Sequence, residues 1–325
     1  MPDQSVAINP PESSSVQIYR DRARVYAEAA KTANTRKAYA LDWTAFCTFC
    51  EVIGQRAIPA SPDTVTAYLI YLAEERRYKL STIQRHLSSI SVAHKTANVP
   101  SPTQTAQVSL VLSGLQKTYG TTQHPKKAAV LEEIQQMMRH IPSNRIGLRD
   151  RALLLMGFGG AFRRSELAGL QREDIELTPD GLRVTLRRSK TDQTGQGRVV
   201  GIPYGSHRDT CPVRAWQAWA AEMDAHGIMT GFAFRALDRH GNIRTRLSDK
   251  TVALIVKRYA AAAGFDPAQY AGHSLRSGFA TTAGRAHVSE RLIMKQTGHK
   301  STIMVRKYIQ EGTLFEDNAA AEIGL

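Results

Sequence analysis

The sequence predicts a mostly α-helical protein with one small antiparallel β-sheet, built as a helical N-terminal bundle followed by a mixed α/β domain. Apolar residues recur at helical spacing through most of the chain, and serine, threonine or asparagine precedes many of these runs. Between residues 174 and 203 the pattern changes to the alternation that is typical of strands. With 325 residues, the chain is long enough for two domains of ordinary size.

Composition narrows the class of protein. The formal net charge is +14 and the isoelectric point is about 9.9, so a polyanionic partner is the first expectation, although a merely basic protein stays possible on charge alone. No apolar run approaches the roughly 20 residues of a membrane span. The first residues lack the pattern of a secretory signal. The three cysteines make no disulfide framework, so we expect a cytoplasmic protein.

The N-terminal half consists of short helices behind a polar tail. We expect residues 1–17 to be a disordered tail and residues 18–120 to be a helical domain. Asn34 or Thr35 opens a helix that Gly54 ends. The start signals of the later helices are Ser61-Pro62, Ser81 and Ser101-Pro102, and the last helix runs to Gly120. These signals predict a bundle of four or five helices.

Cys47 and Cys50 form a C-x-x-C pair within the first of these helices. A zinc site needs four ligands, and neither a second such pair nor a nearby histidine pair is present. Because the spacing falls on the apolar side of the helix, we interpret the two cysteines as packing residues and predict no metal.

Residues 121–127, TTQHPKK, read as a linker, and residues 128–325 as the second domain. Helical patterns cover residues 130–141 and 148–159 and the segment SELAGL. Pro179-Asp180-Gly181 is a turn between two strand patterns, a third strand pattern is RVVGIP, and Lys190 falls near the tip of the loop before it. Further helices run from Pro212 to Met223, with Trp216 inward, and from Ser248 to Gly264.

The stretch from His273 to Tyr308 concentrates the residues that suit chemistry on an anion. Ser274 can cap a helix with Arg276 in its first turn, and Ser289 can cap a second helix that Gly298 closes. Ser301 can cap a third helix, in which Val305, Tyr308 and Ile309 share a face. His299 then lies in the turn before the helix that carries Tyr308. Two histidines, an arginine and a phenol therefore come from short, linked helices.

These residues resemble a known signature. The H-x-L-R of His273 to Arg276, the G-H of Gly298–His299 and Tyr308 resemble the second half of the tyrosine recombinase (phage integrase) signature. The first half matches A-F-R-R-S-E-L, which contains Arg163, and the family's hairpin lysine matches Lys190. Six matches in the family's order, over nearly the whole chain from about residue 18, make the resemblance specific. It implies the core-binding and catalytic domains of a simple two-domain site-specific recombinase.

The chemistry of phosphodiester cleavage explains why these residue types are needed. A tyrosine phenol has a pKa near ~10, so a nucleophilic Tyr308 needs help in losing its proton. Arginine offers a fork that fits phosphate oxygens, so Arg163 and Arg276 can clamp the phosphate from two sides. His299 is a further donor, and Lys190 is the general acid for the departing 5′ oxygen. His273 is a general base toward Tyr308 or another phosphate donor. Glu166 holds Arg163 or supports His273.

The resemblance also implies the partners. These are double-stranded DNA with specific recombination sites, a dimer on each site and a homotetramer on DNA, with neither ATP nor a metal or other cofactor required. An accessory directionality factor and association with the bacterial nucleoid also fit the family. The acidic C-terminal tail is expected to pack into a neighbouring protomer; a frayed terminus is the alternative. Exposed basic residues are predicted to contact DNA, although a solvated face remains the alternative for most of them singly: Arg36, Lys37, Arg76, Arg77, Lys79, Arg85, Lys95, Lys126, Lys127 and Arg164.

Two other functions remain open from the sequence. One is a type IB topoisomerase-like enzyme that nicks and reseals DNA by the same chemistry. The other is a catalytically silent DNA-binding regulator, which would have no need for Tyr308. The short stretch ahead of residue 18 argues against an added arm-binding domain. The target sequence and the choice between integration, excision and dimer resolution cannot be inferred, because base contacts and DNA bending leave no pattern in one sequence. Delivery of Tyr308 in cis or in trans also stays open, although the resemblance favours cis.

Overall fold

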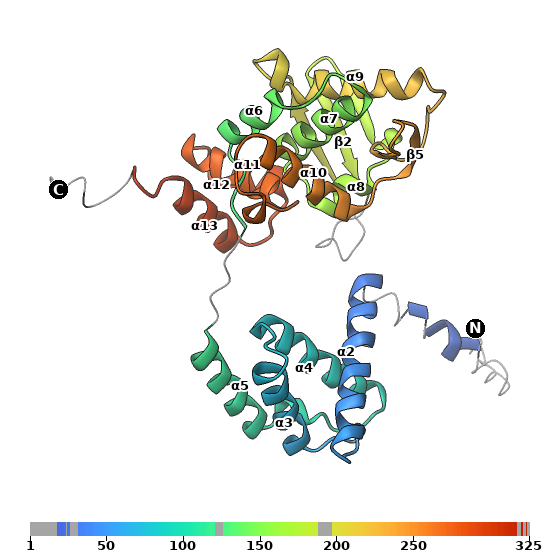
Figure 1. The fold of residues 1–325 in the computed structure, drawn as a ribbon, viewed down its shortest axis with the longest axis vertical. Coiled ribbons are helices and arrows are strands. Elements are labelled where there is room, and N and C mark those ends of the chain that lie inside the picture. The colour runs from blue at the N-terminus through green and yellow to red at the C-terminus, as the bar shows by residue number, and fades with distance from the viewer. Residues whose placement is uncertain are drawn as a thin grey trace, which may run out of the picture. The chain divides into compact units, whose positions relative to one another are not determined.

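The computed structural model describes residues 18–23, 25–26, 32–120, 126–187, 197–316, 320 and 323. The chain forms two compact units, residues 1–123 and 124–325, which are blue to green and green to red in Figure 1. Each unit is described by itself. The predicted tail at 1–17, most of the predicted linker and the loop with Lys190 lie outside the described residues.

The regular structure of the N-terminal unit is all helical among the described residues. It contains α2 (Ala33–Val52), α3 (Pro62–Glu74), α4 (Leu80–Thr96) and α5 (Ala106–Tyr119), with a 3-10 helix at Pro102–Gln104. Residues 18–23 and 25–26 are also helical. The predicted cap Ser61 accepts a hydrogen bond from the Thr64 amide.

Three of the predicted helix starts in this unit are wrong by a few residues. Thr32, rather than Asn34 or Thr35, caps α2. The residue before α4 is Lys79, so Ser81 lies inside the helix. Ser101-Pro102 opens only the short 3-10 helix, and Thr105 caps α5. Thr32 and Thr105 each accept a hydrogen bond from a free amide of the first turn, whereas Lys79 makes no capping hydrogen bond.

The core of this unit lies among all four helices. Phe46 and Cys50 of α2 pack with Tyr68 and Leu69 of α3 and Ile90 of α4, all of them buried. Cys50 thus takes the packing position predicted for it, while Cys47 is partly exposed. A buried polar network also joins the helices, which we call the Asp42 network. Asp42 accepts two hydrogen bonds from Arg85 and pairs with His86, and His86 hydrogen-bonds to the Tyr68 hydroxyl.

The C-terminal unit surrounds two small sheets with helices. The helices are α6 (Leu131–Arg139), α7 (Arg145–Gly159), α8 (Arg164–Gly169), α9 (Pro212–Asp224), α10 (Asp249–Ala262), α11 (Ser274–Arg285), α12 (Glu290–Thr297) and α13 (Thr302–Gly312). Short 3-10 helices lie at Arg172–Asp174, Arg208–Thr210 and Pro267–Gln269. The predicted helices of this half are all present, and Trp216 is buried as expected.

The main sheet has three antiparallel strands in the order β1 (Ile175–Thr178), β2 (Gly181–Leu186) and β3 (Arg198–Pro203). Val184 of β2 lies opposite Ile175 on one side and Val200 on the other. Gly181 has a φ of +144°, and a Cβ there would lie 2.2 Å from the Ile202 carbonyl oxygen. The turn therefore needs glycine. A second hairpin, β4 (Arg235–Leu237) with β5 (Ile243–Arg246), was not predicted because its strands are short and rich in arginine.

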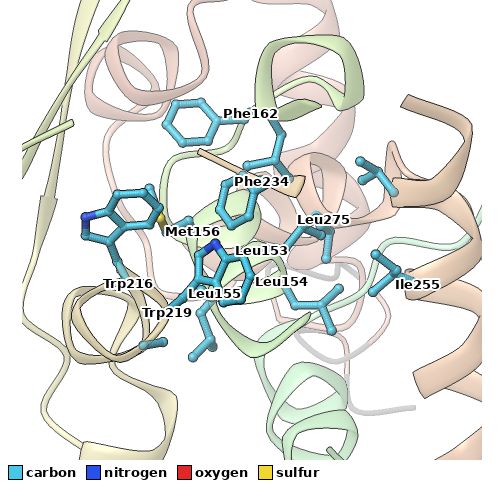
Figure 2. Close-up of a cluster of buried hydrophobic side chains, with 14 of the residues drawn as sticks. Leu153, Leu154, Leu155, Met156, Phe162, Trp216, Trp219, Phe234, Ile255 and Leu275 are labelled. Carbon is cyan, nitrogen blue, oxygen red and sulfur yellow. The ribbon is translucent and has the colours of Figure 1, made fainter. Parts of the chain in front are cut away.

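The largest core lies in this unit and supports the loops around the candidate site. Figure 2 shows Leu153 to Met156 of α7 packed with Trp216, Trp219, Phe234 and Ile255. Phe162 and Leu275 belong to the same cluster and are almost fully buried. Each of them immediately precedes an arginine of the signature in the sequence, Arg163 and Arg276. The core thus fixes the backbone of both arginines.

Helices α11, α12 and α13 lie together at one side of the C-terminal unit (Figure 1). Ala280, Ile293, Val305 and Tyr308 form their shared core. Gly298 ends α12 in the left-handed conformation, as predicted. The predicted cap at Ser274 is wrong: Ser274 is the first helical residue, His273 precedes it, and the Ser274 hydroxyl accepts a hydrogen bond from the Ala271 amide instead. Ser289 and Ser301 stand at the cap positions, but their side chains make no capping hydrogen bond.

Candidate active site

A buried carboxylate holds the first arginine of the signature. The Glu166 side chain is only 2% exposed. It accepts a hydrogen bond of 2.6 Å from Nη1 of Arg163 and another of 2.9 Å from the Arg163 backbone amide. Because Arg163 directly precedes α8, the second contact also satisfies a free amide at the start of that helix. Of the two roles predicted for Glu166, the geometry fits holding Arg163.

The second arginine, Arg276, is 1% exposed. Its Nη1 donates to the Ala161 carbonyl over 2.8 Å, which links α11 to the loop before Arg163. Its Nη2 finds no hydrogen-bond partner among the residues that the structure describes. Burial, followed by the charge of Arg163, lowers the pKa of Arg276 to about 10, so the guanidinium stays charged at neutral pH.

Tyr308 of α13 meets His273 at the start of α11. The Tyr308 hydroxyl lies 3.1 Å from Nε2 of His273, within hydrogen-bond distance, and Tyr308 is 8% exposed. Burial is the main cause that raises the pKa of the phenol. His273 keeps an exposed edge, yet its partial withdrawal from water and the charges of Arg276 and Arg163 lower its pKa. The neutral imidazole can therefore accept the hydrogen bond from a protonated phenol.

His299 also lies close to the tyrosine ring. The two rings have their centroids 6.0 Å apart. Nδ1 of His299 is hydrogen-bonded to the Thr297 hydroxyl over 2.8 Å, so its Nε2 is not used by that contact. Burial and then the charges of Arg276 and Arg163 lower the pKa of His299 to about 4. The sequence pattern did not single out Thr297, whose role depends on the turn that Gly298 makes.

Arg198, at the start of β3, completes the described part of the cluster, and the sequence analysis missed it. It carries no motif and its contacts are far away in the sequence. The guanidinium donates to the Gln296 carbonyl at the end of α12, and its Nη2 lies 3.7 Å from a Glu166 oxygen. Only the contact in the folded chain reveals its position.

The cluster carries more positive than negative charge. Among the residues that the structure describes, Glu166 is the carboxylate that faces Arg163, Arg198 and Arg276. The lowered pKa values keep His273 and His299 neutral near pH 7. Buried donors on Arg198 and Arg276 lack partners among the described residues. Unpaired donors of charged groups are costly when they are buried. The arrangement therefore favours binding of an anion beside a tyrosine hydroxyl.

The remaining predicted residues are more scattered. Lys190 lies outside the described residues. All ten predicted DNA-contacting residues are exposed, but several already have partners. Arg85 pairs with Asp42, Lys127 with Glu133 and Arg164 with Asp249, while Lys126 donates to the Ala268 carbonyl. These pairs offset part of the positive charge that was assigned to DNA.

Within the described ranges, no group of three or more histidine, cysteine, aspartate or glutamate side chains is arranged to hold a metal ion. None of the described helices is both long enough and apolar enough to cross a membrane.

Comparison with known sequences gives several matches. The sequence model of the phage integrase family matches residues 130–313. A protein described as an integrase/recombinase xerD homolog from Selenomonas ruminantium is 40% identical over 303 residues, which cover 92% of this chain and 87% of that protein. Recombinase cre of Escherichia phage P1 is 25% identical over 287 residues, covering 82% and 80% of the two chains.

Solved structures show the same fold at low sequence identity. The Tn1549 transposon integrase in complex with transposon right end DNA aligns with a TM-score of 0.61 and 19% identity, over 94% of this chain and 97% of that chain. A λ integrase dimer bound to a core site aligns with a TM-score of 0.60 and 18% identity, over 93% and 98%. The predicted mostly helical fold with small antiparallel sheets is thus confirmed as that of the tyrosine recombinases.

Proposed function

Since the chain belongs to the phage integrase family and is a tyrosine-type site-specific recombinase, we propose that it cuts and rejoins DNA strands through a 3′-phosphotyrosyl intermediate formed on Tyr308. The observation that carries this proposal is the contact of 3.1 Å between the Tyr308 hydroxyl and His273, beside the buried Arg276 and the partly buried Arg163. A nucleophile, a base and an anion clamp are the parts that this reaction needs.

Attack begins with the phenol in its protonated form. As the Tyr308 oxygen forms a bond to phosphorus, His273 takes the phenolic proton through Nε2. The raised pKa of Tyr308 and the lowered pKa of His273 oppose full transfer before attack, so the proton leaves as the bond forms.

Charge on the phosphate is then stabilised from two sides. Arg163 and Arg276 offer guanidinium donors to the non-bridging oxygens, and Glu166 keeps Arg163 in place. Nδ1 of His299 faces the Thr297 hydroxyl, which itself donates to the Ile293 carbonyl, so Nδ1 carries the proton of the neutral imidazole. His299 therefore donates to the phosphate through Nε2 only as the imidazolium, a form that the negative charge of a bound phosphate favours. Pre-set donors of this kind need no rearrangement at the moment of reaction, which is the source of their effect on the rate.

The bond from phosphorus to the 5′ oxygen breaks as Lys190 donates a proton to that oxygen, leaving a 5′ hydroxyl. A 5′ hydroxyl of the partner duplex then attacks the phosphotyrosyl bond and restores the phenol. Because the covalent link conserves the energy of the phosphodiester, no ATP is consumed. We propose two such rounds through a Holliday junction, in a tetramer with a dimer on each site. The λ integrase dimer on its core site supports the dimer on each site. An accessory factor can then set direction.

Covalent trapping tests the proposal. The protein is incubated, in the presence of EDTA, with a pool of duplexes of randomised sequence that carry a nick. Cleavage beside the nick releases a short fragment, so the intermediate accumulates. We expect a denaturation-resistant protein–DNA adduct whose linked DNA can be sequenced, and we expect Tyr308→Phe to abolish it. The matched control is Tyr204→Phe, since Tyr204 is a partly exposed tyrosine of the same unit.

The outcomes separate the candidate functions. An adduct that Tyr308→Phe removes, and that joins two duplexes when both carry the selected sequence, supports the recombinase. An adduct that only reseals its own strand and relaxes supercoiled plasmid points to the topoisomerase-like activity. Tight, sequence-selective binding with no adduct from the wild-type protein would contradict cleavage and leave the regulator.

A further inference from the structure

Arg198 connects three segments that are far apart in the sequence. It is the first residue of β3, eight positions after Lys190 in the sequence. Its Nη1 donates to the Gln296 carbonyl over 2.8 Å, at the C-terminal end of α12. Its Nη2 lies 3.7 Å from Oε2 of Glu166, the carboxylate that holds Arg163. One guanidinium thus links the start of β3 to the turn before His299 and to Glu166, the carboxylate that holds Arg163.

The turn before His299 is shaped around this guanidinium. Gly298 has a φ of +66°, and a Cβ added there would lie 2.9 Å from Nε and 3.0 Å from Cζ of Arg198. The glycine therefore meets two demands at once, a left-handed backbone and close approach of the arginine. His299 is the next residue, so the contact between Gly298 and Arg198 helps to fix the backbone position of His299.

Stability alone does not explain where Arg198 lies. Its side chain is only 19% exposed, yet neither Nε nor Nη2 has a hydrogen-bond partner among the residues that the structure describes. Burial lowers its pKa, the Glu166 carboxylate opposes that shift without cancelling it, and the charge of Arg163 lowers the pKa further. A buried guanidinium with unpaired donors beside another guanidinium is unfavourable. Positions of this kind are typical of sites where charge serves a function.

We propose that Arg198 is a positioning residue for strand cleavage, which holds the start of β3, the Glu166–Arg163 pair and the turn that presents His299 in one arrangement. The inference rests on the proposed function of the site. It assigns Arg198 no contact with the reacting atoms. Burial is the main cause that lowers the pKa of His299, and the positive charge of Arg198 adds to the lowering after those of Arg276 and Arg163.

The test compares three substitutions with one control in the full chain. Arg198→Met removes charge and hydrogen bonds, Arg198→Gln keeps one donor for the Gln296 carbonyl, and Arg198→Lys keeps the charge without the two-armed reach. The control is Arg183→Met on the neighbouring strand β2, where Arg183 makes an exposed ion pair with Glu176. Single-turnover adduct formation is measured at saturating DNA, and the dissociation constant is measured separately.

We expect Arg198→Met and Arg198→Gln to slow adduct formation by more than about tenfold while affinity changes less than about threefold. Arg198→Lys should recover part of the rate, and Arg183→Met should behave as wild type. A residue needed only for folding would lower the amount of active protein and leave the rate of the active fraction unchanged. Wild-type rates in both charge-removing variants would overturn the proposal, as would an equal loss in Arg183→Met.

A second readout does not depend on cleavage. Histidine side-chain NMR on the free protein follows the titration midpoint of His299, which should lie near pH 4 in the wild-type chain. The midpoint should rise in Arg198→Met and Arg198→Gln and stay low in Arg198→Lys. An unchanged midpoint in the first two variants would overturn the inference even if no DNA substrate is ever cleaved. If the midpoint rises in these two variants but the wild-type protein forms no adduct, the proposed function is refuted, while the inferred contact between Arg198 and the turn at His299 still stands.

Discussion

At the scale of single residues, the pKa values of Tyr308 and His273 are shifted in opposite directions, which keeps the proposed nucleophile protonated in the free protein. Burial raises the pKa of Tyr308, while partial burial and two arginines lower the pKa of His273. The proton of their shared hydrogen bond therefore stays on the phenol until a phosphate can accept the charge of the attacking oxygen. In the proposed reaction, a bound phosphodiester would supply the anion that the guanidinium donors lack among the described residues.

The pH dependence of cleavage follows from these shifts. A general base must be unprotonated, so the rate of adduct formation should be constant near neutral pH and should fall as the pH drops through the pKa of His273. That pKa is lowered, so the midpoint of the acid limb should lie below 6.5. Single-turnover rates from about pH 4.5 to about pH 8 measure it, with DNA binding measured at each pH. A limb centred above 6.5 would contradict His273 as the base.

Removing the charge of Glu166 should destabilise the C-terminal unit. Glu166→Gln leaves the buried guanidinium groups without their carboxylate, at a cost on the order of 3 kcal/mol. Because sulfate can replace the missing negative charge, its stabilising effect should be larger in the variant. Urea unfolding of the full chain in a Trp43→Phe background measures this, since the other tryptophans, Trp216 and Trp219, both lie in the C-terminal unit.

Two results would contradict this picture of Glu166. One is an unfolding midpoint equal to that of the parent chain. The other is a sulfate effect of the same size in both proteins. Glu176→Gln is the control, because Glu176 pairs with Arg183 in an exposed ion pair and its loss should change stability by less than about 1 kcal/mol.

The sequence allowed these residues to be predicted to different extents. Arg163, His273, Arg276, His299 and Tyr308 stand in recognisable local motifs, and the structure brings all five into one cluster. Arg198 could not be predicted, since its contact with Gln296 spans 98 positions and follows only from the fold. The function of Lys190 stays a prediction, because the residue lies outside the described part of the chain.

At the scale of elements, α11 packs unusually closely against an extended segment. The Ala129 amide donates to the Ser274 carbonyl over 2.9 Å. A Cβ added to Gly278 would lie 1.8 Å from the Ala129 carbonyl oxygen. The helix with His273 and Arg276 therefore rests on the backbone of residues 127–129, with no room for a side chain between them. This contact sets the depth of α11 in the unit.

Gly278→Ala should consequently destabilise the C-terminal unit by at least about 1–3 kcal/mol, since backbone must move to admit the methyl group. Gly114→Ala in α5 is the matched control, because nothing lies within 4 Å of a Cβ there. That substitution should stabilise α5 by up to about 1 kcal/mol through helix propensity. Thermal unfolding measures the change in Tm for both variants, which should be negative for Gly278→Ala and positive for Gly114→Ala. Equal changes in Tm would contradict the packing argument.

The helices were easier to predict than their first turns. Period and stop signals identified each long helix, while several starts moved because a neighbouring threonine caps better or a 3-10 turn comes first. The β4–β5 hairpin was missed because two short strands rich in arginine give no alternating apolar pattern. Such strands depend on the surrounding unit rather than on local propensity.

At the scale of the whole molecule, the net charge of +14 predicts how DNA binding responds to salt. The logarithm of the binding constant should fall linearly with the logarithm of salt concentration, because each phosphate contact releases counterions. Lys37 and Lys79 are exposed and have no carboxylate partner in the described structure, whereas Lys127 pairs with Glu133. We expect the first two to contribute more to the slope.

Lys79→Ala should therefore weaken binding to all sequences alike and reduce the magnitude of the salt slope by about 1. Lys127→Ala should change the slope less, since its positive charge is already offset. Fluorescence anisotropy with a labelled duplex at several salt concentrations measures both. A slope that is identical in wild type and Lys79→Ala would show that Lys79 faces solvent in the complex.

The positions of Phe162 and Leu275 have a consequence for retargeting such a protein to new DNA sequences. Both side chains are inserted into one rigid core, and each is one peptide bond from an arginine of the site. Core substitutions that are selected for expression or heat tolerance would therefore also change the position and orientation of the Arg163 or Arg276 side chain. A library that varies exposed helical faces and leaves this core untouched would change which sequences are bound while the reaction chemistry stays constant.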